Sequence, residues 1–191
     1  MDKLFNKEKT ALVVIDLQKG IAAMPTKPYE AKDVIANAAK LAKAFRKNGM
    51  PVFLVRVSSS PDGKDRLMPI TDDENPWGKI KPAADWNELV PEMGPEAGDF
   101  IITKKQWGAF YGTDLDLQLR RRKIETIVLC GIATNIGVES TARFAFEYGY
   151  QQIFAEDAMS GRSAEEHNHT VKTAFPRMGR VRKTDNILAN L

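Results

Sequence analysis

The sequence has a single cysteine, Cys130, among its 191 residues, so no internal disulfide can form. No apolar run approaches the roughly 20 residues that a membrane-spanning helix needs. The N-terminal residues MDKLFNKEK are charged throughout and lack the apolar core of a signal peptide. A strong charge imbalance is absent too, since the formal net charge is +3. The one basic cluster, at 120–123, has no interleaved aromatic residues of the kind that single-strand binders use. We therefore expect a cytoplasmic protein that neither enters membranes nor binds nucleic acid.

What the chain does contain is an alternation of apolar runs, typical of buried strands, with segments of helical spacing. Strands are expected at 10–17, 51–57, 100–104, 126–131, 152–156 and 180–183, and helices at 34–45, 113–123, 138–149 and 163–175. In the third of these helices, one face is expected to hold Val138, Ala142, Ala145, Phe146 and Gly149. Such alternation predicts right-handed crossovers and a parallel sheet covered on both faces. We expect an α/β protein of three-layer α/β/α architecture, with a single domain over residues 1–191.

Residues 58–98 interrupt this alternation. They contain six prolines, show no clear period and form a stretch too long for an ordinary connection. Loops of this kind in compact domains form a lid, a pocket wall or a subunit contact. The sequence leaves these three possibilities open.

Polar residues are expected to converge at the carboxyl ends of the strands, where open parallel sheets bind ligands. Asp16 lies near the end of the first expected strand, Lys104 ends the third, and the turn 133–138 follows the fourth and opens a helix. An acid and a lysine at neighbouring strand ends would form a charged pair whose shifted pKa values suit proton transfer. A structural salt bridge at the sheet edge explains the same two residues equally well.

Three stretches of the chain resemble the signature blocks of the isochorismatase-like, or cysteine hydrolase, family. They are VVIDLQ at 13–18, TKKQWGAFYGTDLDLQLR at 103–120 and CGIATNIGVESTARFAFEYGY at 130–150. The resemblance covers nearly the whole chain except the long middle loop. It implies a six-stranded, mostly parallel sheet of Rossmann-like architecture and assembly as a homodimer or larger homo-oligomer. It also implies hydrolase activity, because members with a full triad use an aspartate, a lysine and a cysteine to hydrolyse amides.

Carried onto this sequence, the resemblance makes Asp16 and Lys104 the catalytic residues and places the family cysteine at Gly137. The chain therefore resembles the bacterial branch of the family in which the nucleophile is missing. We expect substrate to be bound by Gln18, Ala133, Thr134 and Gly137. The family also tends to have a non-proline cis peptide bond before the helix that carries the nucleophile, here between residues 132 and 133.

The two positions that decide the chemistry are Cys130 and Gly137. Cys130 lies within an apolar strand, where a free cysteine is a small buried hydrophobe with a raised pKa and little reactivity. Gly137 has no group that could attack a substrate, but it leaves space near the N–H groups of a helix N-terminus, which bind anions and oxygens. True isochorismatases, which the chain resembles at this glycine, cleave a vinyl ether by protonation from the aspartate and addition of water.

These observations lead to two hypotheses. The first is an isochorismatase-like hydrolase that acts on a small molecule by Asp-mediated proton transfer and water attack, without a covalent thioester. The alternative is a catalytically silent oligomeric or ligand-binding member of the family. Neither requires a cofactor or a metal. His167 and His169 are spaced i, i+2, so they do not share a helix face and are poor joint ligands; we expect both to be exposed.

Overall fold

The strands of the protein form one six-stranded sheet. In the computed structural model, which describes residues 4–72 and 83–191, the strand order is β3-β2-β1-β4-β5-β6. The strands are β1 (Thr10–Ile15), β2 (Val52–Val57), β3 (Phe100–Lys104), β4 (Thr126–Ile132), β5 (Gln151–Ser160) and β6 (Arg180–Arg182). Every neighbouring pair is parallel. The predicted six-stranded parallel sheet is confirmed.

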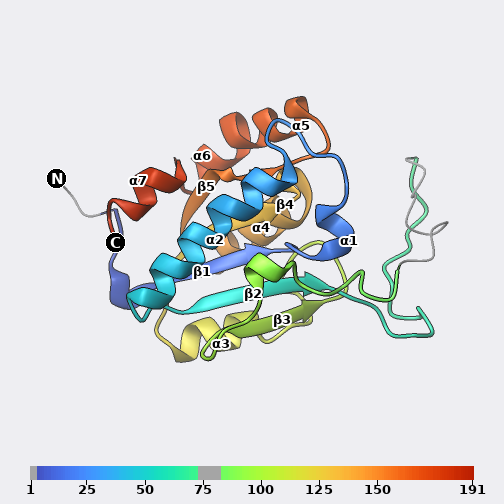
Figure 1. The fold of residues 1–191 in the computed structure, drawn as a ribbon, viewed down its shortest axis with the longest axis horizontal. Helices are drawn as coiled ribbons and strands as arrows, with labels where there is room; N and C mark the ends of the chain where they lie inside the picture. Colours follow the sequence, from blue (N-terminus) through green and yellow to red (C-terminus); the bar gives the residue numbers. More distant parts are fainter. Residues whose placement is uncertain (1–3, 73–82) are drawn as a thin grey trace.

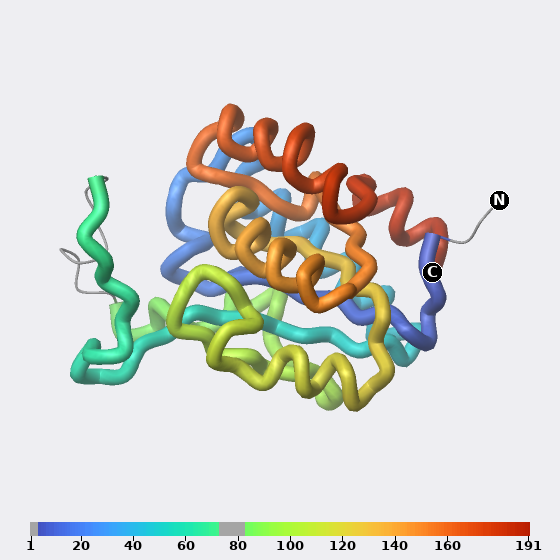
Figure 2. The backbone as a smooth tube through the Cα atoms, turned by 180° about the vertical axis from the view of Figure 1, so that it is seen from behind, coloured from blue at the N-terminus to red at the C-terminus, as the bar shows by residue number. Residues whose placement is uncertain are grey.

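Helices cover both faces of this sheet, as Figures 1 and 2 show from opposite sides. The helices are α1 (Lys19–Ala22), α2 (Ala31–Lys47), α3 (Leu115–Arg121), α4 (Glu139–Glu147), α5 (Ala164–His169), α6 (Phe175–Met178) and α7 (Thr184–Leu188). Side chains of α2 and α7 pack with Leu12 and Val14 of β1 in one core, whereas α3, α4 and α6 pack with Val13 and Ile15 in the other. This arrangement confirms the predicted three-layer architecture.

Two features of the sequence account for the best-predicted elements. All six residues of β1 are buried, as expected for a central parallel strand with helices on both sides. In α2, the fully buried residues Val34, Ala38, Leu41 and Phe45 recur every three or four positions, which places them on one helix face.

Other boundaries differ from the prediction. Strand β5 runs to Ser160 instead of ending near residue 156, because after a register shift Met159 and Ser160 pair with Gly131 and Ile132 of β4. The side chains of Glu156 and Asp157 accept hydrogen bonds from Tyr29 and Thr184. The helix expected at 163–175 divides into α5, a π-helical turn at Thr170–Ala174 and α6. Pro176 follows this turn and has no N–H for a helical hydrogen bond, which accounts for the interruption.

Two helix-face assignments were also wrong: Gly149 is exposed and lies beyond the end of α4, and Phe146 is exposed within it. Phe146 was expected on the buried face of α4, but its side chain is 50% exposed, whereas Val138, Ala142 and Ala145 are fully buried. At 100° per residue, position 146 falls about 80° from position 138, at the margin of the apolar stripe.

The long middle segment, 58–98, has almost no regular secondary structure in its described part, as its lack of a hydrophobic period predicted. Between residue 58 and residue 98, the described part of the chain contains no strand and only a short 3-10 helix, Pro91–Met93. Residues 59–72 extend away from the sheet beyond the carboxyl ends of the strands (Figures 1 and 2). Among the residues that the structure describes, no helix has both the length and the apolar character needed to cross a membrane.

Candidate active site

Asp16 directly follows β1 and stands at the carboxyl edge of the sheet in an uncommon backbone conformation. Its φ is 53°, in the left-handed region that non-glycine residues seldom adopt and that clusters at functional sites. Its backbone N–H donates to the carbonyl of Val55 at 2.9 Å, which ties the residue to β2. Its carboxylate is buried, since the residue is only 4% exposed.

The neighbouring strand β4 makes this conformation possible through a close backbone approach. A Cβ atom at Gly131 would lie 2.0 Å from the carbonyl oxygen of Ile15, and the φ of Gly131 is +122°. Only glycine fits this position without a backbone shift. Gly131 therefore lets the ends of β1 and β4 meet beside Asp16.

Lys104 forms a buried ion pair with Asp16, although the two strands are not neighbours. We expected the ends of adjacent strands, but β2 lies between β1 and β3. The long side chain of Lys104 crosses the end of β2, and its Nζ lies 2.7 Å from Asp16 Oδ2. The ammonium group also donates to the carbonyl oxygen of Trp107. Lys104 is 1% exposed, so this is an interior pair and not a surface salt bridge.

The pKa of the Asp16 carboxyl group is shifted in opposite directions by burial and by Lys104. Burial raises its pKa to about 6, while the charge and hydrogen bond of Lys104 act in the opposite direction. Oδ2 contacts Lys104, whereas Oδ1 is buried without a hydrogen-bond partner among the described residues. A carboxyl group with this pKa can hold or release a proton near neutral pH.

Gly137 lies against this ion pair. It belongs to a π-helical turn, Thr134–Val138, that leads from β4 into α4, not to the first turn of a regular helix as expected. A Cβ atom at Gly137 would lie 2.9 Å from Ile15 Cγ2, 3.1 Å from Asp16 Oδ2 and 3.4 Å from Lys104 Nζ. The structure thus brings Asp16, Lys104 and Gly137 together at the carboxyl edge of the sheet, as expected from their places after the strands.

Of the other predicted substrate-binding residues, Gln18 and Thr134 are buried, and their polar atoms are hydrogen-bonded within the protein. Ala133 is joined to Ile132 by a cis peptide bond, which confirms that expectation. Thr134 is fully buried, and its hydroxyl is bonded to the ring of His167. Gln18 is also fully buried; its Oε1 accepts from the N–H of Val57 at 2.8 Å, and its Nε2 donates to the carbonyl oxygens of Val57 and Trp86. Their contacts with substrate stay predictions.

The expectation that both histidines are exposed was wrong for His167. This residue is 1% exposed, and its Nδ1 lies 2.8 Å from Thr134 Oγ1. Its ring meets the edge of the Tyr29 ring, with 5.7 Å between centroids. Burial lowers the pKa of His167, with Glu156 opposing the shift. His169 is exposed, as expected.

Asn135 is a second residue that sequence reasoning missed. Its Oδ1 is buried and has no hydrogen-bond partner in the part of the chain that the structure describes. The only signal in the sequence was its place inside the predicted turn 133–138.

Cys130 does not belong to the site. It is fully buried in β4, and burial raises the pKa of its thiol to about 12, so the expected structural role is confirmed. Over residues 4–72 and 83–191, no three His, Cys, Asp or Glu side chains are grouped so that they could hold a metal ion. A metal-free site stays a prediction.

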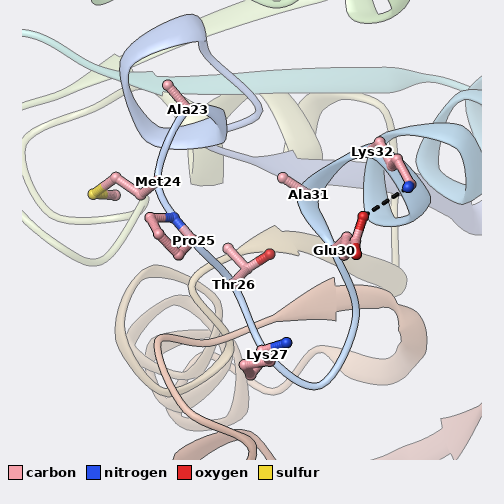
Figure 3. A pocket seen from close by; sticks show the side chains of 8 residues that line it. All are labelled: Ala23, Met24, Pro25, Thr26, Lys27, Glu30, Ala31 and Lys32. Atoms are coloured by element: carbon pink, nitrogen blue, oxygen red, sulfur yellow. Dashed lines mark ion pairs between the residues drawn. The ribbon is translucent and has the colours of Figure 1, made fainter.

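A separate hollow lies on the connection between α1 and α2. It has a volume of about 380 Å³ and is lined by residues 23–27 and 30–32. Figure 3 shows these side chains, with the 2.7 Å ion pair between Glu30 and Lys32 at the start of α2. None of the residues around the Asp16 carboxylate lines this hollow. The candidate site is therefore defined by its buried charged groups.

The fold and the site define a parallel α/β protein with a buried acid–lysine pair at the carboxyl edge of its sheet. The isochorismatase domain model matches residues 10–186, and the chain belongs to the isochorismatase family. It is 56% identical to the uncharacterized isochorismatase family protein YwoC of Bacillus subtilis (strain 168), over 95% of this chain and 93% of that protein.

Two further relatives extend this comparison. The structure of an isochorismatase family protein from Burkholderia thailandensis superposes with a TM-score of 0.89 at 43% identity, covering 98% of this chain and 97% of that one. The ureidoacrylate amidohydrolase RutB of Variovorax paradoxus (strain S110) is 32% identical over 78% of this chain and 68% of that protein. The family thus includes a relative named for amide hydrolysis.

Proposed function

We propose that this protein hydrolyses a small molecule at the site formed by Asp16, Lys104 and Gly137, with Asp16 as the proton donor and without a covalent intermediate. The observation that carries this proposal is the buried Asp16 carboxyl group, whose Oδ1 has no hydrogen-bond partner among the described residues and whose Oδ2 lies beside a position that has no side chain. Burial raises the pKa of Asp16 to about 6, so this carboxyl group keeps its proton closer to neutral pH than an exposed aspartic acid does. A pKa near the working pH is what a general acid needs.

Vinyl ether hydrolysis is the leading reaction because it needs an acid and water but no nucleophilic side chain. Asp16 would transfer its proton to the terminal methylene carbon of the ether, which becomes a methyl group while the adjacent carbon becomes an oxocarbenium ion. Water adds to that carbon and loses a proton, and the resulting hemiketal releases an alcohol and a ketone. Lys104 would hold the Asp16 carboxylate in place and stabilise it after the proton has left.

Acyl transfer to a thiol is the competing mechanism, and the chain offers no thiol for it. Its single cysteine lies inside the sheet, and position 137 beside the ion pair is glycine. If the substrate is an amide, as the name of the Variovorax relative suggests for that protein, water must attack it directly. The same absence of a thiol favours the second candidate, a catalytically silent ligand-binding or oligomeric protein.

A substrate panel separates these functions. Wild-type protein should turn over at least one compound among enol ethers, small amides and esters, and the intact protein should show no added mass during turnover. A trapped acyl-enzyme would contradict the mechanism. If no compound in the panel is hydrolysed by an activity that depends on Asp16, while the protein still binds ligands, the silent alternative replaces the proposal.

A further inference from the structure

Thr141 bonds two backbone segments next to the candidate site, the Gly137 turn and the loop after Lys104. This residue of α4 is fully buried. Its hydroxyl donates to the carbonyl oxygen of Gly137 at 2.7 Å, and its Oγ1 accepts from the backbone N–H of Ala109 at 3.1 Å. One side chain therefore bonds both the turn beside Asp16 and the loop that follows Lys104.

The loop at 105–112 is held by hydrogen bonds within it and by contact with α4. The amide of Gln106 donates to the carbonyl oxygens of Gly108 and Tyr111 at 2.9 and 2.7 Å. Gly108 lies close to α4, since a Cβ atom there would be 3.4 Å from the ring of Phe144. The carbonyl oxygen of Trp107 in this loop accepts from Lys104 Nζ. The position of the loop thus fixes one of the two partners of the lysine ammonium group.

We propose that Thr141 is a positioning residue, whose hydroxyl holds the Gly137 turn and the 105–112 loop together and so sets how closely the Lys104 ammonium group approaches Asp16. Its effect on turnover rests on the proposed function, but its effect on the ion pair does not. The hydroxyl of Thr141 bonds backbone groups and not the Asp16 carboxylate, so we expect it to act through the backbone groups that it bonds.

Removal of the hydroxyl should have a specific electrostatic consequence. Thr141→Val keeps the volume of the side chain but leaves the Gly137 carbonyl and the Ala109 N–H without this partner. The loop and the turn can then separate, and Lys104 loses its fixed distance from Asp16. Because Lys104 holds the pKa of Asp16 down, that pKa should rise. A merely structural threonine would lower the unfolding temperature and leave the pKa of Asp16 where it was.

The test is a titration of the Asp16 carboxyl carbon by NMR in protein with carbon-13 labelled aspartate, with Asp16→Asn used to assign the resonance. Thr141→Val and Thr141→Ala should raise the pKa of Asp16, and Thr141→Ser, which keeps the hydroxyl, should restore the wild-type value. The matched control is Thr10→Val. Thr10 is also fully buried and donates to a carbonyl four residues earlier, that of Asn6, but it lies at the opposite edge of the sheet.

The outcomes separate this inference from the proposed function. An unchanged Asp16 pKa in folded Thr141→Val and Thr141→Ala, or an equal rise in Thr10→Val, overturns the role of Thr141. Neither result depends on turnover. If the pKa rises as expected but the wild-type protein hydrolyses nothing through Asp16, the proposed function fails and the positioning role stands. If turnover exists, Thr141→Val should lower kcat by roughly tenfold or more with little change in KM, as expected for a misplaced catalytic group.

Discussion

At the scale of single residues, the site depends on a position that has no side chain. Gly137 leaves free the space next to Asp16 Oδ2, where any Cβ atom would lie within 3.1 Å of that oxygen. The cysteine of this chain is elsewhere, inside β4. The chemistry of the site therefore rests on a carboxyl group and an ammonium group, with backbone around them.

Gly137→Ala adds only one methyl group, but we expect it to lower both ligand binding and turnover. The added methyl group must displace Ile15 Cγ2, which would be 2.9 Å away, or push against the Asp16 carboxylate. We expect ligand affinity and kcat/KM to fall by roughly tenfold or more, because misplacement of a catalytic group by about 1 Å can cost more than that. Steady-state kinetics and calorimetric titration measure both quantities. Gly94→Ala is the control, since Gly94 follows the 3-10 helix Pro91–Met93 outside the site and its Cβ atom would meet only the carbonyl oxygen of Pro91, at 3.1 Å. An equal effect of the two substitutions would contradict this account.

Prediction from sequence succeeded for residues that follow strand ends and failed for residues that reach the site from elsewhere. Asp16 and Lys104 could be identified because they close apolar runs, and the carboxyl ends of parallel strands share one edge. His167 contacts Thr134, 33 positions earlier in the chain. Thr141 contacts Ala109, 32 positions earlier. Contacts of this kind depend on how helices pack against the turn, which no local spacing records.

At the scale of elements, the ion pair spans three strands. Lys104 reaches from β3 over the end of β2 to the residue after β1. The sequence predicted the strands but not their order, and the order decides which charged groups can meet. The division of the expected 163–175 helix has a similar origin, because the effect of Pro176 on the preceding turn outweighs the helical spacing of the apolar residues.

This arrangement predicts how pH should affect activity. If protonated Asp16 is the active form, kcat/KM should fall as pH rises through about 6, the pKa of that group. Lys104→Met removes the cation that lowers this pKa, so the falling limb should move to higher pH while the maximal rate drops. Lys9→Met is the control, since the 2.6 Å pair of Lys9 with Glu125 lies at the surface, at the amino ends of β1 and β4. The measurement is the dependence of kcat/KM on pH, from about pH 4 to about pH 9. If the falling limb of Lys104→Met lies at the same pH as that of the wild-type protein, Lys104 does not lower the pKa of Asp16.

At the scale of the whole molecule, the alternation of strands and helices predicted the three layers. It did not predict which apolar side chains are exposed on the surface. Exposed aromatic side chains gather where α4 meets the 105–112 loop. Trp107 and Tyr111 are 62% and 69% exposed, and Phe144 and Tyr148 are 39% and 44% exposed. The rings of Phe144 and Tyr148 lie 6.2 Å apart between centroids. Aromatic clusters on a surface are typical of interfaces.

We propose that this aromatic cluster joins copies of the chain in the homo-oligomer that the family resemblance implies. Sedimentation should then give a mass that is a multiple of 21.3 kDa. Phe144→Glu should lower that mass by placing a charge in the interface. Phe146→Glu is the control, because Phe146 is also exposed but lies two positions along α4, on a different face. A monomer at all concentrations, or equal dissociation of both variants, would contradict the proposal.

The most direct test of the central claim compares wild-type protein with Asp16→Asn on a substrate found in the panel. The amide keeps the shape of the side chain but cannot transfer the carboxyl proton. We predict that kcat falls by the roughly 10²- to 10⁴-fold expected for a lost general acid, while calorimetry shows that the ligand still binds. The control is Asp33→Asn, because Asp33 is exposed in the first turn of α2, outside the site, and its substitution should leave kcat unchanged. If folded Asp16→Asn retains turnover within a few-fold of wild type, Asp16 is not the proton donor.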